Sequence, residues 1–267
     1  MHDSESLFVS EDGWFLPTPL TTGPWRPDAM HGGPPCALIA RSIEQELADN
    51  ELVGRINIDL ESPVPLVPLA IGVSRNQISR RVAKLQVTLS TSDRQVASAQ
   101  ALLLRAEPFD LSEVTPEAAP ALADSGLAVR GPDPFHDAPV VYHRDAVEHR
   151  FERGGFGRPG PTTLWVRLLC PLVAGEEAGG LAHLFAAADF GSAVSQSLPI
   201  DSPVALINVD VSVALARMPI GPWIRIESTW PMLNEAGLGL AVTRLADVDG
   251  HLGVGTHSQI AHSRRPR

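Results

Sequence analysis

The sequence of 267 residues contains few cysteines and no long apolar run. Cys36 and Cys170 are too few and too far apart for a disulfide framework or a CxxC metal site, so we interpret them as reduced structural thiols. No apolar stretch approaches the roughly 18 residues of a membrane span, and the acidic start of the chain lacks the basic-then-apolar order of a signal peptide. We therefore expect a cytoplasmic protein with no membrane span.

Positive charge is also scarce. The chain carries 21 Lys and Arg against 31 Asp and Glu, a formal net charge of −10. Phosphate binding along a nucleic acid needs a surplus of basic residues, so the balance argues against nucleic acid as the main partner. A hydrophobic content of 44% is typical of a globular protein, and the length allows one large domain or two of ordinary size.

Several common catalytic signatures are missing. There is no G-x-S-x-G nucleophile elbow, no G-x-G-x-x-G and no P-loop, which removes the usual serine-hydrolase and nucleotide motifs. His136, His143 and His149 lack metal-site spacing, and His257 and His262 fall on opposite faces of a predicted strand. We expect no metal and no cofactor.

One stretch, from Met30 to Leu47, predicts a buried helix around which the chain is organised. Pro34 and Pro35 fit the first turn of a helix, where the amide hydrogen that proline lacks would be unpaired. Apolar residues then recur at helical spacing: Cys36, Ile39, Ala40, Ile43 and Leu47. Gly32 and Gly33 have no side chains, so the first free amide hydrogens could be approached by a polar or anionic group.

Strand-like runs follow this helix at 55–61, 69–79, 81–90 and 95–105. The next stretch is interrupted by prolines and rich in Ala, Asp and Glu, which is typical of a linker. We predict an N-terminal unit over 1–106, a Pro-rich linker over 107–143 and a C-terminal unit over 144–267.

The C-terminal unit repeats the order of the first. A helix candidate at 180–197 precedes Ile207–Val211, which echoes the sequence of Ile56–Leu60, and strand-like runs follow at 222–230, 237–246 and 251–262. The repeat predicts a duplicated α+β unit with antiparallel sheets.

These residues resemble a known family. A helix opened by His-Gly-Gly and wrapped by an antiparallel sheet is similar to the hotdog fold. The motifs Ala-Ala-Asp-Phe in the second helix, Ile-Asn-Val-Asp in the next strand and His-Ser-Gln near the end resemble the double-hotdog acyl-CoA thioesterases of the TesB-like type. The resemblance extends from about Phe15 to His262 apart from the linker. It implies a tandem hotdog that hydrolyses acyl-CoA in fatty acid metabolism, with the active site between the halves.

The resemblance also implies the catalytic residues. The family's carboxylate falls on Asp189, its glutamine on Gln259 and its strand hydroxyl on Asn208, where such enzymes often carry Thr. Asp189 would activate a water as general base or attack the thioester directly. The amides of Gly32 and Gly33 would polarise the thioester carbonyl at the positive end of the helix dipole.

The residues alone leave other interpretations open. Asp189 follows three alanines in an apolar helix and is costly to bury unless paired or used, but it could also lie on an exposed face or cap the helix end. Asn208 and Gln259 fit an ordinary solvated sheet face equally well. His31 could be a general base, but we favour a structural hydrogen-bonding role beside the His-Gly-Gly oxyanion site.

Three further expectations concern function and partners. The runner-up function is a non-catalytic acyl-CoA or acyl-carrier binding protein, and a hydratase ranks last because His183 and Asp189 lack same-face spacing. Arg80 and Arg81, beside Arg75 and Lys84, could hold the phosphates of coenzyme A or form a solvated basic turn. Exposed sheet faces and paired halves in the family that the chain resembles also suggest a homo-oligomer.

Overall fold

The computed structural model describes residues 6–110, 139–157, 159–193, 198–199, 201–228 and 232–264. Its helices are α1 (Gly33–Gln45), α2 (Gly180–Ala188) and α3 (Phe190–Ala193), with the short turns η1 (Pro19–Thr21) and η2 (Tyr142–Ala146). The strands are β1 (Phe8–Glu11), β2 (Trp14–Pro17), β3 (Glu51–Leu60), β4 (Ala70–Ser79), β5 (Val82–Ser90), β6 (Gln95–Arg105), β7 (Val147–Arg153), β8 (Thr163–Leu168), β9 (Val204–Asn208), β10 (Asp210–Leu215), β11 (Ile224–Ser228), β12 (Met232–Leu233), β13 (Leu238–Asp247) and β14 (Gly250–Ser263). No helix in this part of the chain is long and apolar enough to cross a membrane.

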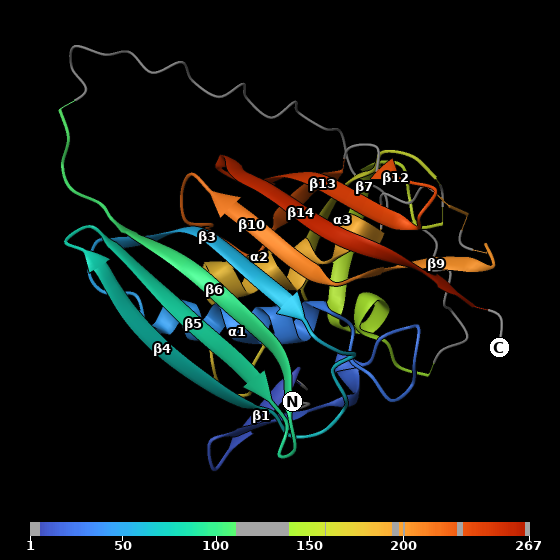
Figure 1. Ribbon diagram of the computed structural model, residues 1–267, viewed down its shortest axis with the longest axis horizontal. Coiled ribbons are helices and arrows are strands. Elements are labelled where there is room, and N and C mark those ends of the chain that lie inside the picture. Colours follow the sequence, from blue (N-terminus) through green and yellow to red (C-terminus); the bar gives the residue numbers. More distant parts are fainter. Residues whose placement is uncertain are drawn as a thin grey trace.

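One antiparallel sheet of 12 strands joins the two halves (Figure 1). Its order is β4-β5-β6-β3-β10-β14-β13-β11-β8-β7, with β9 paired to β14 and β12 to β13. Outward from the central pair, β3-β6-β5-β4 is matched by β10-β14-β13-β11. The predicted repeat of element order is therefore present, and the two sheets meet edge to edge at β3 and β10.

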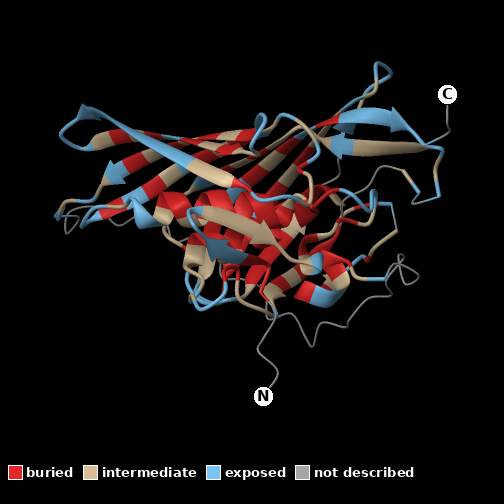
Figure 2. Ribbon diagram, turned by 90° about the horizontal axis from the view of Figure 1, so that it is seen from below, coloured by how far each residue is buried: buried red, intermediate tan, exposed pale blue. Residues whose placement is uncertain are grey.

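The helices pack on one face of the curved sheet and form the centre of the core (Figure 2). Glu44 near the end of α1 contacts Leu181 at the start of α2, and His31 before α1 contacts Asp189 after α2. The two helices are therefore antiparallel, and each helix start faces the other helix's end. The hairpin of β1 and β2 forms a separate small sheet.

Helix α1 forms where the sequence predicts it. The helix begins at Gly33 with prolines in its first turn, and its residues are buried from Gly33 through Ala40. Because a helix that is apolar almost all round must be covered on every side, the sheet curves around it.

Most predicted strands are found within a few residues of their expected bounds, but β7 and β8 were not predicted. Alternate residues of β7, Val147, His149 and Phe151, are buried, so a period-two signal was present among charged neighbours. The second helix is shorter than expected: α2 ends at Ala188 and α3 at Ala193, while 194–197 lie outside the described residues.

The five-residue echo does not mark structurally equivalent positions. Ile56 is fully buried, whereas Ile207 is 44% exposed. The run that contains Ile207 is divided at Val209 into β9 and β10, and such a break changes which residues face the helices. The fold repeats, but Ile207 and Ile56 face opposite sides of the sheet, while Val211 after the break is fully buried.

Most of the predicted linker, at 111–138, lies outside the described residues. Its final part includes Tyr142, which is fully buried and donates a hydrogen bond from its hydroxyl to the carbonyl of Ala186 at 2.9 Å. Tyr142 is therefore part of the packed core, while the domain boundaries remain a prediction.

Candidate active site

Asp189 lies where α2 ends and α3 begins, and its side chain is 9% exposed. Its Oδ1 accepts a hydrogen bond from Nδ2 of Asn208 at 2.9 Å, and its Oδ2 lies 3.1 Å from Nδ1 of His31. The carboxylate is thus turned towards groups from two other segments. This geometry fits neither an exposed helix face nor a carboxylate that caps its own helix.

Asn208 and Gln259 lie directly opposite each other on β9 and β14. Nε2 of Gln259 donates to Oδ1 of Asn208 at 3.3 Å, and Nδ2 of Asn208 also donates to Oγ of Ser192 at 2.5 Å. Among the hydrogen bonds of the described residues, Gln259 is linked to Asp189 through Asn208. Hydrogen bonds therefore run from the amide of Gln259 through the amide of Asn208 to the carboxylate of Asp189. This arrangement differs from a solvated sheet face.

His31 is buried immediately before α1, with its ring 4.9 Å from Tyr142 and 5.0 Å from Phe190, measured between centroids. The amide N–H of Gly33 donates to Nδ1 of His31 at 3.1 Å. The same nitrogen faces Asp189, and it cannot accept from Gly33 and donate to Asp189 at once. The Gly33 amide is therefore hydrogen-bonded to His31 when Nδ1 carries no proton, and it is released from His31 when Nδ1 is protonated.

Gly32 packs directly against the carboxylate. A Cβ added at Gly32 would lie 2.7 Å from Oδ2 of Asp189, closer than real contacts allow. The absence of a side chain is therefore what brings the start of α1 and the carboxylate together. His31, Gly32, Asp189, Asn208 and Gln259 are all in one network, although they span most of the sequence.

The sequence analysis missed three neighbours of this network. Ser192 links Asn208 to the carbonyl of Asp189, Tyr142 packs against His31, and His257 lies on the helix-facing side of β14 two residues before Gln259. Burial lowers the pKa of His257, against the opposing charges of Asp189 and Asp210. Its spacing from Gln259 was the one available signal, because alternate strand residues share a face. An odd number of positions separates His257 from His262 on β14, so the two histidines face opposite sides of the strand.

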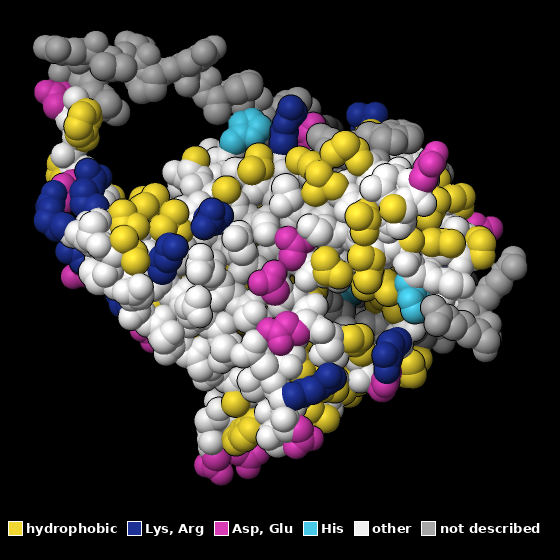
Figure 3. Space-filling model, viewed as in Figure 1, with side chains coloured by type: hydrophobic (Ala, Val, Ile, Leu, Met, Phe, Trp, Pro, Cys, Tyr) yellow, Lys and Arg dark blue, Asp and Glu magenta, His cyan; other side chains and the backbone are white. Residues whose placement is uncertain are grey.

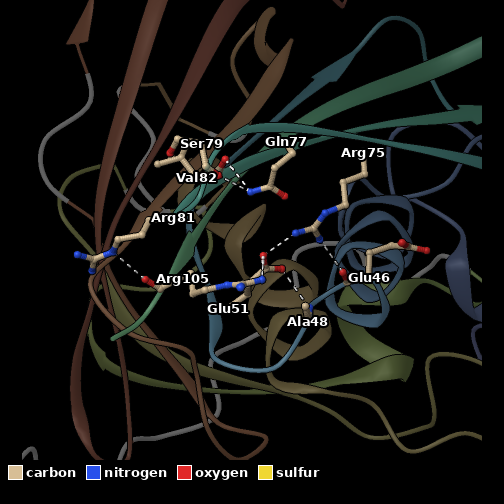
Figure 4. A network of polar contacts seen from close by, with 9 residues as sticks. All are labelled: Glu46, Ala48, Glu51, Arg75, Gln77, Ser79, Arg81, Val82 and Arg105. Carbon is tan, nitrogen blue, oxygen red and sulfur yellow. Dashed lines mark hydrogen bonds and ion pairs between the residues drawn. The ribbon is translucent and has the colours of Figure 1, made fainter. Parts of the chain in front are cut away.

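The predicted phosphate-binding arginines, Arg80 and Arg81, lie elsewhere, at the turn between β4 and β5. Figure 4 shows Arg81 and its surroundings. Arg80 forms an ion pair with Glu107, and Nε of Arg81 donates to the carbonyl of Arg105 at 3.4 Å. Lys and Arg side chains gather at this edge of the molecule (Figure 3). Arg75 reaches the carbonyl of Glu46, just after α1 ends.

The arginine cluster is therefore at the opposite end of α1 from His31. A helix of 13 residues is about 20 Å long at ~1.5 Å per residue. Phosphate binding at this turn stays a prediction. Within the described residues there is no group of three or more His, Cys, Asp or Glu side chains that could hold a metal.

Acidification should destabilise the protein through His31. Burial lowers the pKa of His31 from 6.5 to about 4, against the opposing charge of Asp189. Between these values the unfolded chain binds more protons than the folded one, so the free energy of unfolding falls as pH drops from 6.5 to 4. A shift of this size corresponds to about 3 kcal/mol. We expect His31→Asn to lose less stability over this window in urea unfolding at pH 7 and 4.5.

The comparison between the two proteins isolates His31. Burial also lowers the pKa values of His183 and His257, but both histidines remain in the variant. Equal losses of stability in the two proteins would show that His31 does not titrate in this way.

The arrangement of the sheet and the central helices defines a fold class, and similar solved structures confirm that class. A hot dog fold protein of unknown function from Alicyclobacillus acidocaldarius is 18% identical over 97% of this chain and 96% of its own, with a TM-score of 0.66. An acyl-CoA thioesterase II TesB2 from Mycobacterium marinum is 14% identical over 98% and 96%, with a TM-score of 0.62. A tesB protein from Mycobacterium avium subspecies paratuberculosis is 14% identical over 87% of both chains, also at 0.62. The chain is a double hotdog.

The family follows from the sequence itself. A family model for the acyl-CoA thioesterase N-terminal domain matches residues 21–104, and one for the acyl-CoA thioesterase C-terminal domain matches residues 116–261. The chain therefore belongs to the acyl-CoA thioesterase family. A comparison with curated proteins finds no match.

Proposed function

We propose that this protein hydrolyses acyl-CoA thioesters, with Asp189 as the group that activates water. The observation that supports this most directly is the buried carboxylate, held by Asn208 on one oxygen and facing His31 with the other, at the start of α1. A fixed carboxylate beside apolar walls and a helix start places a base and an oxyanion site together.

Asn208 and Gln259 orient the base and the water. Asn208 donates to Oδ1 of Asp189, and the carboxylate keeps further lone pairs that can accept a proton. Oε1 of Gln259 is buried and has no hydrogen-bond partner among the described residues. A buried acceptor of this kind is suited to take the second hydrogen of the attacking water.

The start of α1 holds the thioester carbonyl. When Nδ1 of His31 carries its proton towards Asp189, the amide of Gly33 is released and can donate to the carbonyl oxygen together with Gly32. Pro34 and Pro35 have no amide hydrogen, so the glycines are the donors available in the first turn.

The reaction balances with these groups. Asp189 takes a proton from water as the water oxygen bonds to the thioester carbon, and the two amides stabilise the resulting oxyanion. The C–S bond then breaks, and the sulfur of coenzyme A leaves with the proton from Asp189. Direct attack by Asp189, which would form an anhydride that water then opens, uses the same residues.

Release of free thiol from a panel of acyl-CoAs tests this function. We expect turnover with at least one chain length, and its preference would define the acyl group. Binding of acyl-CoA without thiol release would instead support the runner-up, a non-catalytic acyl-CoA or acyl-carrier binding protein. Assembly into a homo-oligomer and a cytoplasmic location stay predictions.

A further inference from the structure

An exposed aromatic and basic pair is formed by two segments that also carry residues of the catalytic network, and it has no part in the mechanism above. The guanidinium carbon of Arg264 lies 5.0 Å from the ring centroid of Trp25, and Trp25 is 53% exposed. Arg26 lies next to Trp25 in an exposed ion pair with Asp28. Both members of the pair are attached to segments that carry site residues.

Trp25 belongs to the loop that leads into His31. The loop is closed by hydrogen bonds from Gly23 to the carbonyl of Ala29 at 2.9 Å and from His31 to the carbonyl of Thr21 at 2.9 Å. A Cβ at Gly23 would lie 3.1 Å from the backbone nitrogen of His31. Trp25 is therefore two residues from a point that touches the start of the site.

Arg264 follows Gln259 by five residues, directly after β14. Its amide donates to the carbonyl of Pro203 at 2.9 Å, which continues the pairing of β14 with β9. At ~3.3 Å per residue, the backbone of Arg264 is about 16 Å along the strand from Gln259. That span is comparable with an extended pantetheine arm.

We propose that Trp25 and Arg264 bind the nucleotide of coenzyme A, with adenine stacked on the indole ring and phosphate paired with the guanidinium group. This inference rests on the proposed function, since the thioester must reach Asp189. Arg264 covers one face of Trp25, and the exposure of the indole leaves surface for a base. Stacking on Trp and bidentate pairing with Arg are the standard ways in which proteins hold these groups.

The cluster at Arg80 and Arg81 is the competing location. Those arginines contact Glu107 and the carbonyl of Arg105 and lie beyond the far end of α1. Trp25 and Arg264, in contrast, extend from segments that hold His31 and Gln259. The geometry favours the second pair because the strand from Arg264 to Gln259 is comparable in length with an extended pantetheine arm, whereas Arg80 and Arg81 lie beyond the whole length of α1 from His31.

Assays with two substrates, one with the nucleotide and one without it, distinguish an effect on nucleotide recognition from an effect on catalysis. The full-length protein and its variants are assayed with the preferred acyl-CoA and with the same acyl group on N-acetylcysteamine, which lacks the nucleotide. We expect Trp25→Ala and Arg264→Gln each to raise KM for acyl-CoA about tenfold, with kcat within about twofold. Neither variant should change kcat/KM for the short thioester.

Arg150→Gln is the matched control, because Arg150 also stacks on a tryptophan, with 5.0 Å to the ring centroid of Trp223 on another part of the surface. It should leave both substrates unaffected. An unchanged KM for acyl-CoA in both test variants, or equal losses on the two substrates, would overturn the proposal. So would a rise in KM confined to the Arg80→Ala, Arg81→Ala double variant.

A binding measurement keeps this test independent of turnover. Calorimetric titration with coenzyme A and with pantetheine should show that Trp25→Ala weakens only the binding of coenzyme A. If the wild type hydrolyses neither thioester, the proposed function fails, while this titration still decides the nucleotide site. Equal affinity of wild type and Trp25→Ala for coenzyme A would reject that site.

Discussion

Asp189→Asn is expected to lower kcat by roughly 10²–10⁴-fold, the usual effect of losing a general base, with little change in melting temperature. The substitution removes the proton acceptor but keeps the shape of the side chain. Its amide oxygen can still accept from Asn208, so that contact of the carboxylate has a replacement. The measurement is kcat beside melting temperature on the preferred acyl-CoA.

Gln259→Ala provides the graded comparison. It removes an orienting amide that reaches Asp189 only through Asn208, and it leaves the base in place, so it should cost less than Asp189→Asn. Near-normal turnover by a well-folded Asp189→Asn protein would contradict the assignment of Asp189. A stable, inactive protein would leave open only whether the carboxylate acts as base or nucleophile.

Gly32→Ala is expected to reduce kcat by about 10²-fold, because a catalytic group displaced by about 1 Å can lose that much. The new Cβ would lie 2.7–2.8 Å from the terminal atoms of Asp189, so the carboxylate must move away from its partners. Backbone strain is not the cause, since Gly32 has φ −65° and ψ −28°, which alanine adopts readily.

Gly155→Ala is the matched control for Gly32→Ala. A Cβ at Gly155 would meet nothing within 4 Å, so its activity should equal that of the wild type. The melting temperature of Gly155→Ala should equal that of the wild type, whereas that of Gly32→Ala should be lower, because the displaced carboxylate loses buried hydrogen bonds. Full activity in Gly32→Ala would mean that the carboxylate can shift without loss, and that its position against α1 does not matter for catalysis.

The other helix start shows why the two halves differ. Glu44 of α1 faces the start of α2, where its Oε1 accepts from the amide of Leu181 at 3.3 Å, and a Cβ at Gly179 would collide with its carboxylate. This carboxylate caps a helix. The paired strand residues that face the helices in the first half include Ile58 and Ala99, which are apolar. Asn57 and Gln100 also lie directly opposite each other there, but on the sheet face away from the buried Ile58 and Ala99.

The sequence alone was sufficient for the helix at the centre of the fold and for the order of most strands. Pro34, Pro35 and the apolar spacing that follows fix α1, because these signals act within a few residues along the chain. The motifs that resemble the thioesterase family also pointed to Asp189, Asn208 and Gln259. The neighbouring residues alone could not show whether Asp189 is catalytic or an exposed carboxylate, or whether Asn208 and Gln259 belong to a site or to a solvated sheet face.

Only the tertiary structure decided which of those interpretations the geometry fits. The break at Val209 turns Asn208 towards the helices, and the antiparallel packing of α1 and α2 brings Gly32 against Asp189. Neither feature can be predicted from neighbouring residues, because strand register and helix packing depend on contacts between segments far apart in sequence. The sequence therefore determined most of the elements and which residues could act, while packing determined that these residues meet at one carboxylate.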